Sequence, residues 1–293
     1  MNIKLSINIP LFNEAHGFEK TFNSLLKQID HLEHQYEMNI ADDCSTDSSY
    51  ELCNQLIINN PSYNINLYRH KSNLGIFPNY MFLLGISKGE YVVFPSANDI
   101  YLNKFYNDSV KILDANPKVV LAHSHMRVIG INTKKTLWFE NCASQGQGRT
   151  PYERFLNTLK NLETVSNQGV FRKSALNKTS GWRDIPGADH ILLNEISLYG
   201  NFYNLGKIHI DYYTLENKFE DELIYTQFGL KSFFFKSRYI YDNIKSVFSA
   251  SHVTFITKTV LTFHIIFKQY NLIIFDFYLY TKYLYNKFIK SNS

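Results

Sequence analysis

Short apolar runs alternate with helically spaced apolar residues along the first 125 residues of the chain. The runs are rich in β-branched and aromatic residues, which predicts strands at residues 5–9, 38–41, 65–68, 91–94 and 119–122. Between them, apolar residues recur three or four positions apart, as at Phe18, Phe22 and Leu25, which predicts helices. The alternation predicts an α/β fold with a mostly parallel, Rossmann-like sheet and helices on both faces.

The second half of the chain has a less regular pattern. Residues 130–148 are polar and predict a loop that could cover a site, and periodic apolar residues predict a helix over 151–162. A short strand is expected at 168–171, and a turn-rich stretch at 181–187 opens a helix near Asp189.

The chain ends in an aromatic and basic segment, so we divide it into a catalytic domain, residues 1–222, and a helical C-terminal region, residues 223–293. That region holds 19 of the 46 aromatic residues and nine Lys or Arg against two Asp. Charged residues interrupt its apolar stretches, which argues against a membrane-spanning helix. Two interpretations stay open: contact with an anionic membrane surface, or a helical subdomain packed on the sheet.

The three cysteines show no CxxC pairing and leave one unpaired under any disulfide scheme. This usage favours a reducing compartment. The first ten residues alternate apolar and polar side chains and lack the apolar core of a signal peptide. We therefore expect a cytoplasmic protein.

Two carboxylates, Asp42 and Asp43, follow the second predicted strand directly. Ligands of open α/β sheets bind outside the carboxyl ends of strands, so this pair is well placed to contact a polar ligand. The alternative is purely structural, namely an Asx turn in which Ser48 caps the next helix and Glu51 completes a capping box.

A second polar segment, Ser96-Ala97-Asn98-Asp99, follows the fourth predicted strand. In a doubly wound sheet, Asp43 and Asp99 would face one crevice, with the turn at residues 73–75 beside them. Oxygen ligands of this kind suit Mg²⁺ or Mn²⁺, which would neutralise a leaving diphosphate.

Several motifs, in order, resemble those of the family 2 glycosyltransferases, which are inverting enzymes with the GT-A fold that use nucleotide-diphosphate sugars. Residues 9–14 resemble the family's P-x-Y-N-E segment, with Phe12 in place of Tyr, and residues 42–47 resemble its D-D-G-S-T-D segment. The 73–75 turn with Asn79 resembles its N-x-G turn, and residues 96–99 occupy the place of its D-A-D-D metal motif.

The resemblance implies a donor site and a metal. It assigns donor binding, with a UDP-sugar favoured, to Pro10, Phe12, Glu14, Asp42, Asp43, Asn73, Asn79, Ser96, Asn98 and Asp99. Within this set Pro10, Phe12 and Asp43, together with Asp42, would hold the base and ribose, and Asp99 would bind Mn²⁺ or Mg²⁺. Ser96 and Asn98 replace two acids of the metal motif, so Asp99 is its only carboxylate.

Asp189 resembles the family's catalytic base, which belongs to an acidic pair at the start of a helix; here Ala188 replaces one acid of the pair. Asp189 would take the proton of the acceptor hydroxyl. The alternative is that it only favours a helix N-terminus, where the macrodipole stabilises negative charge. Such a position would keep the carboxylate ionised and lower its basicity.

Other side chains have two interpretations each. His123 and His125 could ligate a transition metal, or be structural or line the acceptor site. Arg69 and Lys71 could pair with diphosphate or be surface charges. Trp138 and Trp182 could stack on a sugar or belong to the core.

The function implied is transfer of a sugar to a hydroxyl of a surface glycan such as lipopolysaccharide or capsule, on a free or lipid-linked acceptor. The replaced acids leave a second hypothesis, an inactive nucleotide-sugar-binding partner in a glycan assembly complex. A nucleotidyltransferase is a third, although residues 10–17 lack the Gly-rich basic loop usual for that class. Nucleic acid is not an expected partner, because the residues before 223 carry a small net negative charge.

Overall fold

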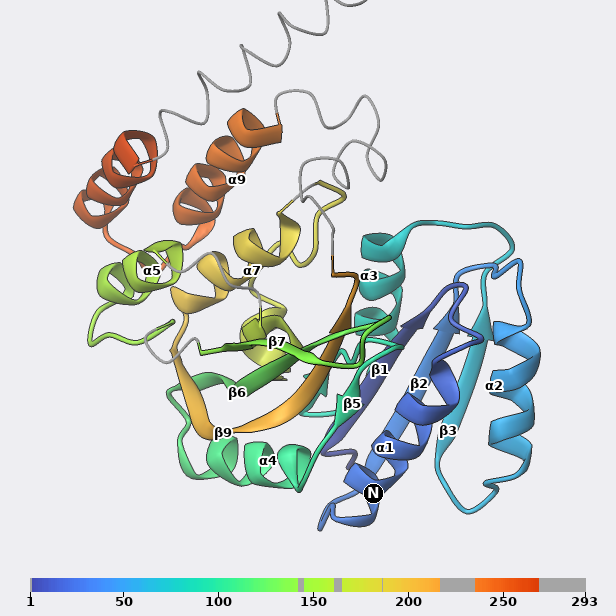
Figure 1. Cartoon of the computed structure of the whole chain (residues 1–293). Coiled ribbons are helices and arrows are strands. Elements are labelled where there is room, and N and C mark those ends of the chain that lie inside the picture. Colours follow the sequence, from blue (N-terminus) through green and yellow to red (C-terminus); the bar gives the residue numbers. More distant parts are fainter. Residues whose placement is uncertain (1, 142–144, 161–164, 186, 217–234, 269–293) are drawn as a thin grey trace, which may run out of the picture.

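The computed structural model describes residues 2–141, 145–160, 165–185, 187–216 and 235–268 (Figure 1). Its centre is a nine-stranded sheet in the order β3-β2-β1-β4-β8-β6-β9-β5, with β7 paired to β6. The strands are β1 (Leu5–Leu11), β2 (Tyr36–Asp42), β3 (Ile65–Arg69), β4 (Tyr91–Val93), β5 (Ile100–Tyr101), β6 (Val119–Gly130), β7 (Thr136–Glu140), β8 (Val170–Arg172) and β9 (Asn201–Thr214).

Strands β3, β2, β1 and β4 form a parallel half, as predicted. Asp42 at the end of β2 lies opposite Leu11 on one side and Arg69 on the other. The carboxyl ends of these three strands are therefore level, and the loops that follow them meet at one edge of the sheet.

Helices cover both faces of this half, which confirms the α/β prediction. The helices of the first half are α1 (Phe18–Asp30), α2 (Ser49–Ile58), α3 (Ile76–Ile86) and α4 (Phe105–Ala115). Apolar side chains of α1, α2 and α4 share one buried cluster with β1 and β2, whereas those of α3 lie in a second cluster on the opposite face.

The other half of the sheet is mixed, so the expectation of a mostly parallel sheet is too simple there. Strand β8 runs antiparallel between β4 and β6, while β9 runs parallel to β6. The polar stretch at 130–148 is not loop throughout, because it contains β7. That strand pairs with the later residues of β6 and is at most half-buried, which explains why its sequence lacks a clear apolar alternation.

The later helices lie beside the mixed half of the sheet (Figure 1). They are α5 (Pro151–Lys160), the 3₁₀ helix η1 (Val165–Gln168), α6 (Lys173–Leu176), α7 (Ala188–Ser197) and α9 (Phe235–Ser249), followed by helical residues 255–268. Two of them, α6 and α7, share a buried cluster with α3. Buried side chains of α5, α9 and the last helix form one apolar cluster that also contains Leu198. The described part of the C-terminal region is thus helical, as predicted, and packs against α5 and α7.

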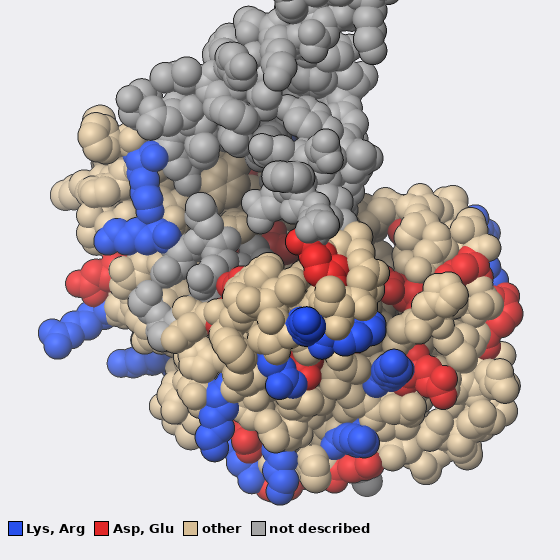
Figure 2. All heavy atoms as spheres, in the orientation of Figure 1, with Lys and Arg blue, Asp and Glu red and all other residues tan. Residues whose placement is uncertain are grey.

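The expected boundary at 222 and 223 lies outside the described residues, as do residues 269–293. Among the described helices, none combines the length and apolarity needed to cross a membrane. On the face drawn in Figure 2, acidic and basic side chains are interspersed over the described surface rather than segregated by sign.

Candidate donor and acceptor site

A cavity of about 550 Å³ opens at the carboxyl edge of the parallel strands. Most of the predicted donor-site residues line it, namely Pro10, Phe12, Glu14, Asp43, Asn73, Asn79 and Ser96. Asp42, Asn98 and Asp99 do not line it. The expectation that Asp43 and Asp99 face one crevice is therefore wrong: Asp99 is fully buried instead. The cavity also includes Ile76, Tyr80 and Asp184, which sequence reasoning did not select.

Asp43 joins two of the loops that form the cavity. Its carboxylate accepts hydrogen bonds from the backbone N–H groups of Leu74 (2.8 Å) and Gly75 (2.9 Å). Gly75 precedes α3 with φ +94° and ψ 161°, a conformation open essentially to glycine alone. The turn expected beside Asp43 is therefore in place, and a carboxylate oxygen retains lone pairs for a ligand.

The hydroxyl-rich segment after Asp43 holds the neighbouring loop rather than facing the cavity. Ser45 Oγ accepts the N–H of Asn13 (3.0 Å), and Asn13 Oδ1 accepts the N–H of Thr46 (2.9 Å). The N-terminus of α2 is held by Asp47, whose Oδ1 accepts the N–H of Ser49 (2.9 Å). Ser48 makes no side-chain cap, so the capping-box alternative is wrong.

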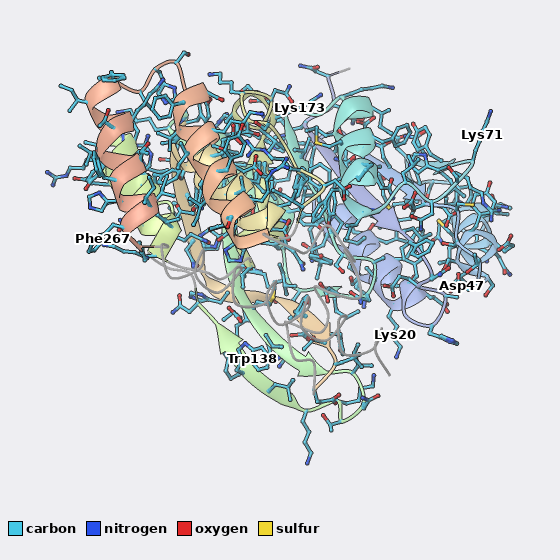
Figure 3. All side chains as sticks on the ribbon, turned by 90° about the horizontal axis from the view of Figure 1, so that it is seen from above. Lys20, Asp47, Lys71, Trp138, Lys173 and Phe267 are labelled. Atoms are coloured by element: carbon cyan, nitrogen blue, oxygen red, sulfur yellow. The ribbon has the colours of Figure 1, made fainter. Side chains whose placement is uncertain are left out.

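Asp42 is fully buried below this loop. Its Oδ2 accepts the N–H of Ser45 (3.2 Å) and pairs with Arg69 Nε (3.2 Å). Arg69 is thereby committed to a structural ion pair at the end of β3. Lys71 is exposed and points into solvent (Figure 3).

The segment that replaces the acidic metal motif reaches the cavity through Ser96, whose Oγ donates to Asn98 Oδ1 (2.7 Å). Asp99 lies beneath, fully buried, and its oxygens accept the Gln168 amide (2.8 Å) and the N–H of Tyr213 (2.9 Å). Burial raises the pKa of Asp99 to about 7, although both hydrogen bonds act in the opposite direction.

The charge of the cavity matches a cation better than an anion. Among its described lining residues the charged side chains are Glu14, Asp43 and Asp184, all acidic. A diphosphate brought here would meet like charge, so a cation would have to accompany it. Asp99, Asn98 and Ser96 offer the hard oxygen atoms that Mg²⁺ and Mn²⁺ prefer. No set of three or more His, Cys, Asp or Glu side chains in the described residues forms a metal cage, so donor phosphates and water would complete the shell.

Asp189 occupies the first turn of α7, as predicted, and its carboxylate is held from one side. Oδ1 accepts hydrogen bonds from Asn167 Nδ2 and Trp182 Nε1, each at 3.0 Å. Neither of these two bonds involves Oδ2. Burial raises the pKa of Asp189 to about 6, so the expectation that the helix N-terminus lowers its basicity is wrong.

An aromatic wall connects Asp189 to the cavity. Trp182 stacks on Tyr80 with ring centroids 4.9 Å apart and planes inclined by 19°, and Tyr80 lines the cavity. Burial raises the pKa of Tyr212, and the carboxylates of Asp99 and Asp189 add to the effect, which places both acids near one ring. Trp182 is a buried core residue that holds Asp189, whereas Trp138 is half exposed.

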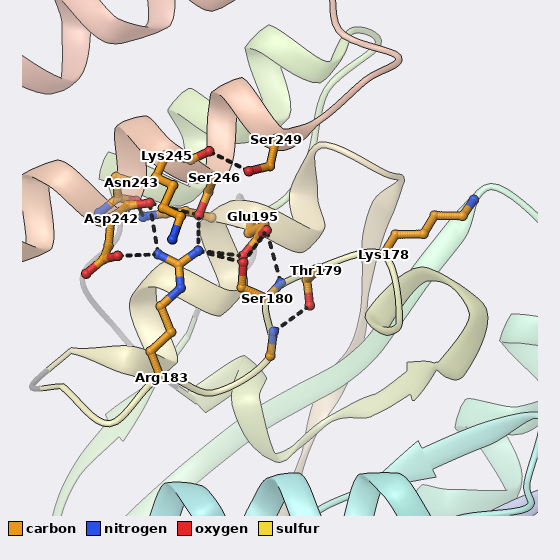
Figure 4. A network of polar contacts seen from close by, with 12 residues as sticks. Lys178, Thr179, Ser180, Arg183, Glu195, Asp242, Asn243, Lys245, Ser246 and Ser249 are labelled. Carbon is orange, nitrogen blue, oxygen red and sulfur yellow. Dashed lines mark hydrogen bonds and ion pairs between the residues drawn. The ribbon is translucent and has the colours of Figure 1, made fainter.

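The loop that carries Trp182 is anchored to the C-terminal helices by Arg183 (Figure 4). Its Nη1 pairs with Asp242 Oδ1 (2.9 Å), and its Nη2 donates to Ser246 Oγ (2.9 Å), both on α9. Glu195 of α7 lies 3.4 Å from Nη2. Neither Arg183 nor its partners were selected from the sequence, because nothing local marks a contact between segments so far apart.

The histidine pair on β6 does not form a metal site with other described residues. His123 is fully buried, and its Nδ1 lies 3.2 Å from Ser166 Oγ. Burial lowers the pKa of His123 to about 3, so the ring is neutral at physiological pH. These contacts agree with the structural interpretation.

Comparisons with known proteins agree with this geometry. The sequence profile described as Glycosyl transferase family 2 matches residues 6–179. The fold is similar to that of S. aureus TarS 1-349 in complex with UDP (TM-score 0.61, 14% identity, covering 90% of this chain and 71% of that chain). The complex of the same protein with UDP-GlcNAc gives a TM-score of 0.62 at 14% identity, covering 90% of this chain and 72% of that chain.

A third similar structure is the mannosyltransferase PcManGT from Pyrobaculum calidifontis in complex with GDP-Man and Mn²⁺. It gives a TM-score of 0.53 at 13% identity and covers 90% of this chain and 80% of that chain. At these identities the likeness shows a shared fold. A comparison with curated protein sequences found no significant match.

Proposed function

Because the chain belongs to glycosyl transferase family 2 and is a glycosyltransferase, we propose that it moves a sugar, with inversion, from a nucleotide-diphosphate donor to a hydroxyl of a surface-glycan acceptor. The observation that carries this proposal is one cavity at the carboxyl edge of the sheet, with the carboxylate of Asp189 behind its aromatic wall. This arrangement supports a donor site with a general base beside it.

The donor is proposed to be a UDP-sugar bound along the β1 and β2 loops. Asp43 would accept hydrogen bonds from the base, while Pro10 and the exposed ring of Phe12 offer apolar surface to its faces. Glu14, Asn73, Asn79 and Ser96 line the rest of the cavity. UDP and UDP-GlcNAc are the ligands of the similar TarS structures, which supports this choice.

We propose Mn²⁺ or Mg²⁺ as the cofactor, held by Asp99 with oxygens of Asn98 and Ser96. When bound, the ion would neutralise charge on the departing nucleoside diphosphate. The acidic lining of the cavity and the Mn²⁺ in the mannosyltransferase structure support this proposal. Asp42 is proposed to act on the donor only indirectly, by holding the loop that carries Asp43.

Asp189 is proposed to act as general base. Asn167 and Trp182 hold Oδ1, which leaves Oδ2 to take the proton as the acceptor oxygen attacks the anomeric carbon. A new carbon–oxygen bond forms while the bond to the diphosphate oxygen breaks, so one displacement inverts the anomeric configuration. A pKa of about 6 keeps the carboxylate ionised at neutral pH yet basic enough to assist.

We place the enzyme in the cytoplasm, in the synthesis of polysaccharide such as lipopolysaccharide or capsule, with acceptors that are free or lipid-linked. The absence of any CxxC pairing in the sequence supports a reducing compartment. Nucleic acid is not proposed as a partner, because acids and bases are mixed on the face shown in Figure 2.

Turnover is tested by incubating the protein with UDP-, GDP- and dTDP-sugars, Mn²⁺ and candidate glycan acceptors, and by following nucleotide release. We expect release with one donor and none without acceptor. Calorimetry then compares Asp99→Ala with wild type, and Mn²⁺-dependent donor affinity should be lost in the variant. Asp108→Ala, an exposed acid in the first turn of α4, is the control. Equal affinity of wild type and Asp99→Ala would contradict the metal assignment.

A further inference from the structure

The last described helix, residues 255–268, presents apolar side chains to solvent as well as to the protein. Leu261 and Ile265 are fully buried in the cluster shared with α5 and α9. On the other side Ile256, Phe263 and Phe267 are 76%, 70% and 83% exposed. A helix partnered on one side only leaves such a patch without cover.

The exposed side chains follow one stripe. Positions 256, 260, 263 and 267 are three or four residues apart and so lie on one helix face. Phe255, 75% exposed, lies beside this stripe. We call these five residues the outer face. Figure 3 shows Phe267 at the opposite end of the molecule from Asp47, whose loop borders the donor cavity.

After Asp242, all the charged residues of α9 and of the last described helix are basic. From residue 243 to residue 268 the sequence has no Asp or Glu, whereas it has Lys245, Lys258 and Lys268. The sequence continues in the same composition, since residues 269–293 contain eight aromatic residues and three lysines against one Asp. Aromatic side chains with flanking bases are the composition that settles at the headgroup level of an anionic bilayer.

We propose that the outer face lies on an anionic membrane surface, with the helix in the plane of the interface. Burial of the phenylalanines would supply most of the affinity, and the lysines would make it dependent on anionic lipid and on salt.

The last described helix shares an apolar cluster with α9, and α9 is joined to the Trp182 loop through Arg183 and its bonds to Asp242 and Ser246. A membrane-bound enzyme would thus hold Asp189 at a fixed height above the lipid. The membrane contact itself does not depend on the proposed reaction; only its use for a lipid-linked acceptor rests on that proposal.

The test is co-sedimentation of the full chain with phosphatidylcholine vesicles, with and without phosphatidylglycerol, in the absence of any donor. We expect binding to the anionic vesicles, weakened by added salt. The double variant Phe263→Ser/Phe267→Ser should bind roughly tenfold more weakly for each phenylalanine removed. Phe139→Ser on β7 removes a 62% exposed aromatic elsewhere and should bind like wild type.

Two other occupants of the outer face are outcomes that would overturn the proposal. If a second copy covers it, the double variant changes the mass measured by light scattering and leaves vesicle binding unchanged. If residues 269–293 cover it, the double variant raises their hydrogen exchange without vesicles and again leaves vesicle binding unchanged. Equal binding of wild type to neutral and anionic vesicles would also refute it. Nucleotide release by the double variant with a soluble acceptor separates this failure from failure of the proposed reaction.

Discussion

The half of the molecule that lines the donor cavity and the half that holds the proposed base are built in different ways. In the first, loops that each follow a strand are joined at one sheet edge by bonds such as Asp43 to Leu74. In the second, Asp189 depends on Asn167 and Trp182, and the loop of Trp182 depends in turn on α9. The difference teaches that the proposed donor site is formed by neighbouring loops, whereas the proposed base is positioned by a series of long-range contacts.

The largest effect on kcat should come from Asp189→Asn. This variant tests whether residues of the second half act in the chemical step without contributing to donor binding. The amide keeps the shape and the bonds to Oδ1 but cannot take a proton, so we expect kcat to fall by about 10² to 10⁴-fold. Donor affinity, measured by calorimetry, should stay near that of wild type. A variant that loses donor affinity in proportion to kcat would break the proposed division between the halves.

The pH dependence of wild type gives a second check on the same carboxylate. Asp189 must be ionised to accept a proton, and burial raises its pKa to about 6. The rate at saturating donor should therefore be constant above that pH and fall about tenfold per pH unit well below it. If the wild-type rate did not fall below pH 6, Asp189 would be excluded as the base.

Arg183→Met should destabilise the protein by about 3 kcal/mol, because Glu195 would remain buried without its cation and Asp242 would keep only the more exposed Arg238. The free energy of unfolding is measured by urea denaturation, with Arg69→Met as the comparison in the first half. Arg69 is more exposed and pairs with one buried acid, so the loss should be smaller. Equal losses would mean that the two halves do not differ in how their ion pairs support them.

The same contrast explains which parts of the molecule the sequence predicts. Strands β1, β2 and β4 are short buried runs and β3 is a short, mostly half-buried one, each followed by turn residues, so residue pattern alone locates them and the loops after them. Strand β9 was not predicted, because it carries polar residues and Gly206 and pairs with β6 about 80 residues away, with register shifts. Gln168 and Tyr213, which hold Asp99, belong to segments with no local signal of that contact.

Asp43→Ala, in the first half, should lower donor affinity and leave kcat nearly unchanged, which is the reverse of the result expected for Asp189→Asn. Two N–H groups of the 74–75 turn lose their acceptor, so the turn loosens and donor affinity should fall about tenfold or more, corresponding to one lost charged hydrogen bond. At saturating donor, kcat should be largely retained. Calorimetry with UDP and initial rates measure the two quantities, and Asp47→Ala controls for general disturbance of the loop.

The smallest effect is expected at Cys44, which stands where the D-D-G-S-T-D segment of the family has glycine. Cys44 has φ +59°, a left-handed conformation that disfavours a side chain by about 1–2 kcal/mol. Glycine removes that strain but loses about 0.5–1 kcal/mol through its freer unfolded chain. Cys44→Gly should therefore stabilise the protein by about 0.5–1 kcal/mol, seen as a higher urea midpoint.

Asn13→Gly is the matched control, because Asn13 has nearly the same conformation, φ +55°, but its Oδ1 accepts the N–H of Thr46. Removing that acceptor costs about 1 kcal/mol and should cancel the relief of strain. A stabilising effect at Asn13 equal to that at Cys44 would show that the bonds between the two loops contribute little. The loops of the first half would then be positioned by strand register rather than by the contacts between them.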